Sequence, residues 1–208
     1  MNREIMVSSQ IEMRGVKNPA VLAAMRKVER DKLVPDEEQP AAYADTPLPI
    51  GHGQTISQPF IVAYMTELLN PGPAQRILEI GTGSGYQAAV LAEIVREVYT
   101  VEIIPALAER ARANLEAMGY RNIHLRTGDG GLGWPEEAPF DGIIVTAAAS
   151  VIPEQLIMQL KPGARMVIPL GNAFSVQSLN VVLREKDGFK IEETIGVRFV
   201  PLTGVTQP

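Results

Sequence analysis

The chain of 208 residues has 24 acidic and 19 basic side chains, a formal net charge of −5, and no cysteine. The lack of cysteine excludes disulfides, thiolate metal sites and cysteine nucleophiles, and the acidic balance gives no overall attraction to nucleic acid. The length suits one well-buried domain, and no segment has the roughly 18 uninterrupted apolar residues of a membrane span.

Residues 1–75 are predicted to form a helical and loop extension. Asn18 and Pro19 stand where the N-cap and first residue of a helix are expected, and Val21, Leu22, Met25 and Val28 follow at helical spacing for packing inward. The first residues lack the apolar core of a signal peptide, so we expect a cytoplasmic protein.

Residues 43–59 are rich in proline and glycine and predict a loop or short hairpin leading into an apolar helix over 60–69. Ser57 lies two residues before Pro59, at the start of that helix. Its hydroxyl therefore fits an N-cap, and from residue types alone this is the preferred interpretation; a role in chemistry is the alternative.

The run 76–92 is the most informative part of the chain. It predicts a buried strand over 77–80, a turn with glycines at 81, 83 and 85, and a helix around 88–92. The glycines remove every Cβ from the turn, and we expect its backbone N–H groups and the helix N-terminus to face a ligand crevice. Tyr86 stands where a dinucleotide fingerprint requires a small residue, and no Gly-Lys-Ser/Thr follows, so neither pyrophosphate nor a P-loop ligand is favoured.

A second strand is predicted over 98–104, with a single acid, Glu102, near its end. Glu102 lies 17 residues after Gly85 (102 − 85), close to the separation of roughly 20 at which Rossmann-type folds place a carboxylate that accepts both ribose hydroxyls. A solvated charge at a strand end is the alternative. The loop 127–131, which contains Asp129, follows a short strand at 123–125 and alone would be an ordinary turn.

The remaining elements predict structure more than chemistry. Residues 105–118 are predicted to form a helix with an apolar face. Trp134 is expected either to fill a loop or to cover a pocket. The only histidines, His52 and His124, lie in a turn and in a strand pattern, so we expect neither to be a base and no metal site. The run 197–202 is strand-like until Pro201. Its end could pair with an extended peptide, and the alternative is a terminal strand that only completes the sheet.

Alternating strands and helices from 76 to about 170 predict an α/β fold with a mostly parallel sheet and helices on both faces. No linker, repeat or low-complexity segment interrupts the sequence. We therefore expect residues 1–208 to be a single domain, with 76–208 as the cofactor-binding core and C-terminal strands.

The Gly-x-Gly-x-Gly loop with Glu79 two residues before it resembles the first motif of the class I S-adenosylmethionine-dependent methyltransferases. The resemblance implies a Rossmann-like fold in which the loop lies beside the methionine part of the cofactor and the preceding acid near its amino-acid end. It also implies that Asp129 accepts from the adenine amino group.

The chain is more specifically similar to the protein-L-isoaspartate O-methyltransferase family, which repairs damaged aspartyl and asparaginyl residues. The similarity rests on Gly-Gln-Thr-Ile-Ser-Gln-Pro at 53–59 and Leu-Glu-Ile-Gly-Thr-Gly-Ser-Gly-Tyr at 78–86, and extends through 18–25, 33–35, 140–149 and 197–204. It implies methyl transfer from S-adenosyl-L-methionine to the free α-carboxylate of L-isoaspartyl residues, giving a methyl ester and S-adenosyl-L-homocysteine.

The same resemblance implies the site residues. Ser57 is expected at the active site, near both cofactor and substrate carboxylate, with Val200 and Leu202 also contacting the substrate. The residues expected at the cofactor are Thr55, Ile56, Glu79, Gly81, Thr82, Gly83, Ser84, Gly85, Glu102, Ile103, Asp129, Gly130 and Thr203.

Two alternatives remain open from the sequence. A class I methyltransferase of small molecules or RNA would use the same cofactor residues, and a binding protein would hold S-adenosylmethionine without transferring its methyl group. The expected partners are damaged proteins and peptides, with no nucleic acid or membrane, and the expected state is a monomer.

Overall fold

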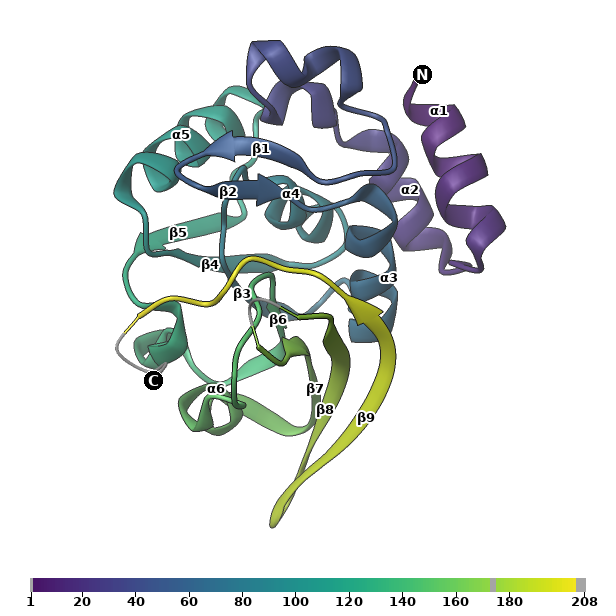
Figure 1. The fold of residues 1–208 in the computed structure, drawn as a ribbon. Helices are drawn as coiled ribbons and strands as arrows, with labels where there is room; N and C mark the ends of the chain where they lie inside the picture. Colours follow the sequence, from purple (N-terminus) through teal and green to yellow (C-terminus); the bar gives the residue numbers. More distant parts are fainter. Residues whose placement is uncertain (1, 173–174, 205–208) are drawn as a thin grey trace.

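The computed structural model describes residues 2–172 and 175–204, and its centre is a seven-stranded sheet in the order β5-β4-β3-β6-β7-β8-β9 (Figure 1). The strands are β3 (Arg76–Ile80), β4 (Glu97–Glu102), β5 (Ile123–Thr127), β6 (Phe140–Val145), β7 (Leu160–Leu170), β8 (Gln177–Glu185) and β9 (Gly188–Val197). Strands β3, β4, β5, β6 and β7 are parallel to one another. Strands β8 and β9 continue the sheet beyond β7 in antiparallel pairing. The prediction of a mostly parallel sheet is confirmed.

The parallel strands are apolar along their whole length because both faces of the sheet are covered. Successive residues alternate between two core clusters: Ile77 and Ile144 contribute to one, whereas Leu78 and Ile143 contribute to the other. The first cluster lies under α2 (Pro19–Lys27), α3 (Pro59–Leu69), α4 (Tyr86–Ala92) and α5 (Pro105–Ala117). The second lies under the short α6 (Glu154–Met158) and the 3₁₀ turns η5 (Gly130–Leu132) and η6 (Pro135–Glu137). Helices therefore cover both faces, as expected.

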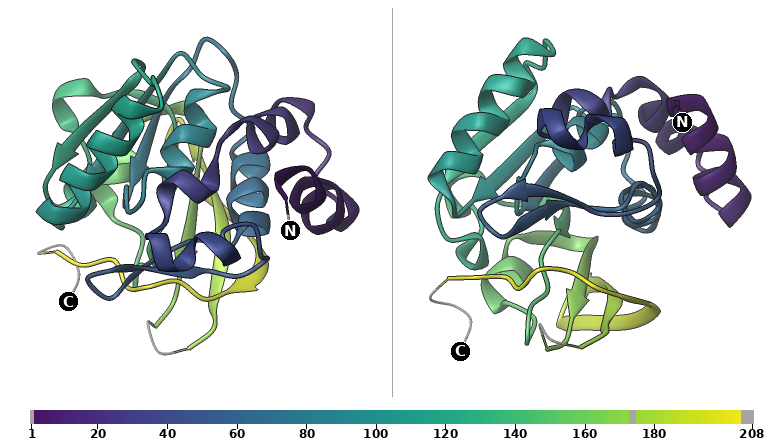
Figure 2. Two further views of the ribbon diagram at one scale, coloured as in Figure 1. Left: turned by 90° about the horizontal axis from the view of Figure 1, so that it is seen from above. Right: turned by 45° about the horizontal axis from the view of Figure 1, so that its top comes forward.

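The N-terminal extension packs on the first face through α2 and α3 (Figure 2). It begins with α1 (Arg3–Ile5), the π-helix η1 (Met6–Ile11) and η2 (Glu12–Arg14), and it continues after α2 with η3 (Arg30–Leu33) and η4 (Asp36–Ala41). The Asn18 side chain accepts from the N–H groups of Ala20 and Val21, which confirms the predicted cap. Met6, Val7 and Ile11 are fully buried, so the extension shares the core of the sheet.

Two irregular segments lie across the carboxyl ends of the strands. One is the hairpin of β1 (Leu48–Gly51) and β2 (Gln54–Ile56). The sequence of residues 43–59 predicted either a loop or a short hairpin here, and the structure has the hairpin. The other is residues 198–204, here called the C-terminal segment, which leaves β9 and crosses the sheet end below the hairpin (yellow in Figure 1). Functional groups of an open α/β sheet gather at this end, so these segments border the natural ligand crevice.

The predicted strand over 98–104 is too long in the structure, because β4 ends at Glu102. Ile104 instead takes the N-cap position of α5 before Pro105, where the chain must turn into the helix. Among the residues that the structure describes, no helix has the length and apolar character needed to cross a membrane.

Candidate active site

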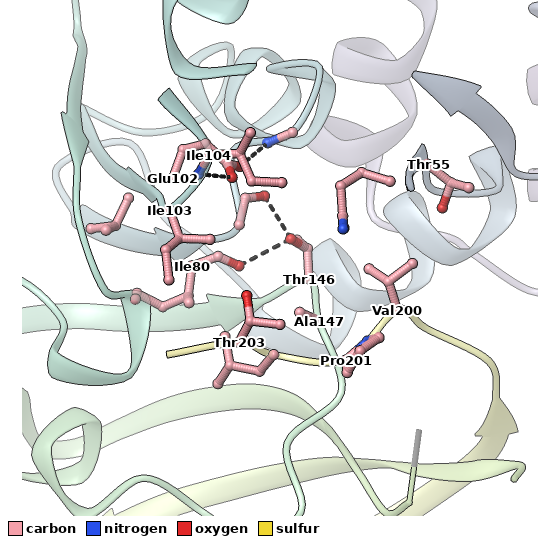
Figure 3. Close-up of a pocket in the computed structure, with 16 residues that line it drawn as sticks. Thr55, Ile80, Glu102, Ile103, Ile104, Thr146, Ala147, Val200, Pro201 and Thr203 are labelled. Carbon is pink, nitrogen blue, oxygen red and sulfur yellow. Dashed lines mark hydrogen bonds between the residues drawn. The ribbon is translucent and has the colours of Figure 1, made fainter. Parts of the chain in front are cut away.

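A pocket opens at the carboxyl ends of β3, β4 and β6, and its lining residues come from widely separated parts of the sequence (Figure 3). This central pocket has a volume of about 60 Å³. Its floor contains Ile80, Glu102 and Thr146, and its opposite walls are the β1–β2 hairpin, through Thr55, and the C-terminal segment, through Thr203. The crevice is at the position where doubly wound sheets bind ligands.

The glycine loop needs glycine at each predicted position. Gly81, Gly83 and Gly85 have φ of +94°, +54° and +87°, a region that side chains disfavour. A Cβ on Gly81 would also lie 2.5 Å from the Thr146 hydroxyl, and one on Gly85 would lie 3.1 Å from Leu115. The loop can therefore approach both its neighbours and a ligand only because these Cβ atoms are missing.

The expectation that loop N–H groups face the crevice is wrong. The N–H groups of Gly81 and Thr82 donate to the Val101 carbonyl, at 2.9 and 3.3 Å, and that of Gly85 donates to the Thr82 carbonyl, at 2.8 Å. The N–H of Gly83 donates to the Glu102 carboxylate at 2.8 Å. These donors are used to fold the loop onto β4, so the loop offers a close backbone surface rather than an anion cradle. This geometry agrees with the absence of a dinucleotide fingerprint.

Glu102 lines the central pocket and is only 5% exposed. One carboxylate oxygen accepts from Gly83 N at 2.8 Å, and the other accepts from Ile104 N at 2.9 Å. Each oxygen has a second lone pair, so the carboxylate can still accept two hydroxyl hydrogens. The two backbone donors fix its orientation toward the pocket, and the alternative of a freely solvated charge is thereby contradicted.

Glu79 lies immediately behind the pocket and is fully buried. Thr100 donates to its Oε2 at 2.5 Å, and because that hydroxyl is already donating, Thr82 must donate to Thr100 across 2.6 Å. The other oxygen, Oε1, has no hydrogen-bond partner among the described residues. Burial raises the pKa of the Glu79 carboxyl to about 8, the Thr100 hydrogen bond opposes this, and the nearby Glu102 charge adds to it.

Thr146 follows β6 and lies at the centre of the site, although the sequence reasoning did not single it out. Its hydroxyl lies 3.0 and 2.6 Å from the carbonyl oxygens of Ile80 and Gly81 and shares its one hydrogen between them (Figure 3). The signal that could have found it is its position directly after the apolar run Ile143-Ile144-Val145, because functional side chains gather where buried parallel strands end.

Ser57 is not the N-cap of α3, and that interpretation of the sequence is wrong. The N-cap is Gln58, and no side chain caps this end of the helix. None of the residues described in 2–172 and 175–204 forms a hydrogen bond with the Ser57 hydroxyl. Ser57 instead borders two cavities, a narrow one over the glycine loop and a wider one beside α3. Its hydroxyl is therefore available for a ligand.

The C-terminal segment is tied to the sheet by backbone pairing and by one buried amide. The Val200 carbonyl accepts from Ala148 N at 2.8 Å, and Leu202 N donates to the Ala148 carbonyl at 2.7 Å. Gln177, 2% exposed, accepts from Phe199 N at 2.9 Å through its Oε1. The Val200 carbonyl and the Leu202 N–H therefore cannot pair with a peptide in the way that the sequence suggested, and any peptide contact here uses other groups of the segment.

The structure brings most of the predicted site residues together. Those that line the central pocket or the narrow cavity are Thr55, Ile56, Ser57, Gly81, Thr82, Gly83, Ser84, Glu102, Ile103, Gly130, Val200, Leu202 and Thr203. Glu79, Gly85 and Asp129 lie outside these linings. Asp129 is nevertheless adjacent, because a Cβ on Gly204 would lie 2.3 Å from its Oδ1. Leu202 lines the central pocket with Glu102 and does not border the wider cavity beside Ser57.

Neither histidine reaches this site. His52 is exposed in the β1–β2 turn, and His124 is exposed on β5, where its ring stacks on Tyr99 with a centroid separation of 4.7 Å. Among the described residues, no group of three or more acidic or histidine side chains could hold a metal ion. The arrangement instead combines a buried carboxylate that can accept further hydrogen bonds, a glycine surface and the serine hydroxyl of Ser57.

The family described as protein-L-isoaspartate(D-aspartate) O-methyltransferase matches residues 1–207. The chain belongs to this family. A protein-L-isoaspartate O-methyltransferase from a Picosynechococcus species is 55% identical over 202 residues, which cover 97% of this chain and 90% of that protein. The enzyme of the same name from Gloeobacter violaceus is 56% identical over 198 residues, covering 95% and 97%.

Solved structures agree with this membership. One protein-L-isoaspartate O-methyltransferase superposes with a TM-score of 0.89 at 27% identity, covering 99% of this chain and 67% of the other. A Plasmodium falciparum protein described as a member of the family, solved in complex with S-adenosyl-L-homocysteine, gives 0.84 at 26% identity, covering 98% and 99%. The chain is thus an S-adenosylmethionine-dependent methyltransferase with the class I fold, and the isoaspartate methyltransferase family fixes its reaction class.

Proposed function

We propose that the chain transfers the methyl group of S-adenosyl-L-methionine to the free α-carboxylate of L-isoaspartyl residues, with Ser57 at the point of reaction. The observation that carries the assignment of Ser57 is its unused hydroxyl, which lies between the glycine loop and an open cavity. Membership of the family supports the methyl-transfer reaction, and the position of the Ser57 hydroxyl supports its assignment to the active site.

The residues around the central pocket fit the cofactor. Glu102 would accept the ribose hydroxyls, Gly81 and Gly83 give the close approach that a Cβ would prevent, and the unpartnered Oε1 of Glu79 is a hydrogen-bonding group left for the amino-acid end. Thr55, Ile56, Thr82, Ser84, Gly85, Ile103, Asp129, Gly130 and Thr203 complete the proposed cofactor site. When bound there, S-adenosylmethionine supplies an electrophilic methyl group on a positively charged sulfur.

The chemistry requires no protein base. An α-carboxyl group titrates near 3.5 and is already ionised at neutral pH, so the nucleophile is formed before it reaches the site. The Ser57 hydroxyl can donate to one carboxylate oxygen and leave the other to attack, without the strong ion pair that a lysine or arginine would form. Alignment and exclusion of water then supply most of the rate enhancement, because opposite charges neutralise as the reaction proceeds.

The start of α3 supports the same position for the carboxylate. No side chain caps this end of the helix, and Ser57, Gln58 and Ile61 border the wider cavity beside it. The partial positive charge of a helix N-terminus favours an anion. Val200 borders both that cavity and the central pocket, so we place it in contact with the substrate. Leu202 lines only the central pocket, and we propose that it contacts the substrate from that side.

We test the function with methyl-labelled S-adenosylmethionine and two peptides that differ only in an isoaspartyl or a normal aspartyl linkage, and count base-labile methyl ester. Selective labelling of the isoaspartyl peptide supports the proposal. Labelling of neither peptide while the cofactor binds contradicts it and favours a methyltransferase of small molecules or RNA, or a binding protein.

The role of Ser57 is tested by Ser57→Ala. We expect cofactor affinity to be kept and most turnover to be lost, because only the carboxylate-orienting hydroxyl is removed. The matched control is Ser9→Ala, which removes an exposed hydroxyl at the N-terminal extension. Unchanged turnover in Ser57→Ala would reject the assignment.

We also propose that residues 1–208 act as one domain, because the larger core cluster contains side chains from Met6 through Val197. The proposed working form is a cytoplasmic monomer that acts on damaged proteins and peptides and does not use nucleic acid or a membrane. Light scattering on the purified protein tests the monomer, and fractionation of the host cells tests the location.

A further inference from the structure

The wider cavity beside α3, here called the lateral cavity, has a volume of about 420 Å³, against about 60 Å³ for the central pocket. Thr55, Thr146 and Val200 line both spaces, and Ser57 borders the lateral cavity. The lateral cavity therefore adjoins the proposed point of reaction at Ser57.

The walls of the lateral cavity are mostly apolar. Ile61 of α3 forms one side, and another is formed by Val197, the last residue of β9, and Phe199 of the C-terminal segment. Apolar surface gains about 25 cal/mol for each Å² removed from water, so such a cavity selects an apolar group over a polar one. A space of this size and character is not explained by a carboxylate alone.

Arg198 is the one charged residue among the side chains that line the lateral cavity. It is exposed, and within residues 2–172 and 175–204 no carboxylate forms an ion pair with it. A guanidinium at the opening of an apolar cavity favours an anion and disfavours a cation nearby.

We propose that the lateral cavity is a subsite for the residue next to the isoaspartyl linkage, that it takes an apolar side chain, and that Arg198 favours a peptide with a carboxylate just beyond that residue. The inference rests on the proposed function, because it places the α-carboxylate at Ser57. It predicts that the enzyme ranks damaged sites by their flanking sequence, although it methylates isoaspartyl linkages in general.

The apolar part is tested with isoaspartyl peptides that carry leucine or serine beside the linkage. We expect kcat/KM to favour leucine about tenfold, which corresponds to partial burial of one aliphatic side chain. Ile61→Ala should reduce this preference severalfold and leave the preference for charge unchanged. An equal kcat/KM for leucine and serine peptides would overturn the apolar subsite.

The charged part is tested with peptides that carry glutamate or lysine one residue further out. We expect the glutamate peptide to be favoured about threefold in kcat/KM at low salt, through KM rather than kcat, since exposed ion pairs contribute little. Arg198→Glu should invert the order. The matched control is Lys186→Glu, which makes the same change in net charge at the exposed turn between β8 and β9.

The outcomes separate the two proposals. If no isoaspartyl peptide is methylated, the proposed function fails. If all are methylated with the same kcat/KM, the function stands and the subsite is overturned. If Arg198→Glu and Lys186→Glu shift the glutamate-to-lysine ratio alike, the function stands and the role of Arg198 is overturned.

Discussion

The buried carboxyl of Glu79 should make the protein less stable as pH rises, and Glu79→Gln should remove this effect. The folded-state pKa of about 8 lies above the ordinary value of 4.5. The folded protein therefore keeps a proton that the unfolded chain releases, and the free energy of unfolding falls as pH rises from about 4.5 to about 8.

The magnitude follows from these two values. One pKa unit corresponds to about 1.4 kcal/mol. The loss of unfolding free energy at pH 7 is that figure multiplied by the difference between pH 7 and the ordinary pKa of 4.5, or roughly 3 to 4 kcal/mol. At pH 5 it is below about 1 kcal/mol. Glutamine has nearly the same shape and keeps an oxygen that can accept from Thr100, but it does not ionise.

The assay is urea unfolding of the ligand-free protein at pH 5, 6, 7 and 8, followed by the fluorescence of Trp134, the only tryptophan of the sequence. The stability of Glu79→Gln relative to the parent should increase by about 2 to 3 kcal/mol between pH 5 and pH 7. Glu116→Gln, on the exposed face of α5, is the control and should show no such change. A difference between Glu79→Gln and parent that is constant across this range would refute the reasoning.

Three further changes test the site. Glu102→Gln places an amide N–H₂ against a backbone donor such as Gly83 N and should weaken S-adenosylhomocysteine binding at least about tenfold in calorimetry; equal affinity would show that the carboxylate does not bind the ligand. Gly130→Ala puts a Cβ 2.4 Å from Ile80 Cγ2 and should lower the free energy of unfolding by about 1 to 3 kcal/mol in urea; an unchanged midpoint contradicts this. Gln177→Leu removes the amide that accepts from Phe199 N and holds the C-terminal segment in position. In initial-rate kinetics the change should raise KM for both substrates more than it lowers kcat, and a loss of kcat alone would contradict this positioning role.

The sequence was sufficient for the parallel core, because the elements there are fixed by local patterns. Ile77 and Ile80 lie in a short apolar run, and glycines follow at positions where the structure has positive φ. The face of α5 was also predictable, since Leu107, Ala108, Ala111 and Leu115 recur at helical spacing and all are buried.

The sequence was insufficient where long-range contacts compete with local patterns. Ser57 has the spacing of an N-cap, but the chain enters α3 with Gln58 at that position. The glycine-loop N–H groups looked free because their acceptors, Val101 and Glu102, come from the neighbouring strand. Thr146 is assigned to the site only when β3 and β6 are known to be adjacent.

The pocket joins parts of the chain that lie far apart in the sequence: Thr55 and Val200 both line it and are separated by 145 positions (200 − 55). During synthesis the glycine loop and Glu102 leave the ribosome long before the C-terminal segment does. The nascent chain can therefore fold its parallel core first, but it has no complete site until the C-terminal segment is added. A cut or frameshift directly after β9 would leave a protein with its sheet but without one wall of the pocket, so catalytic activity would report that residues 198–204 are present.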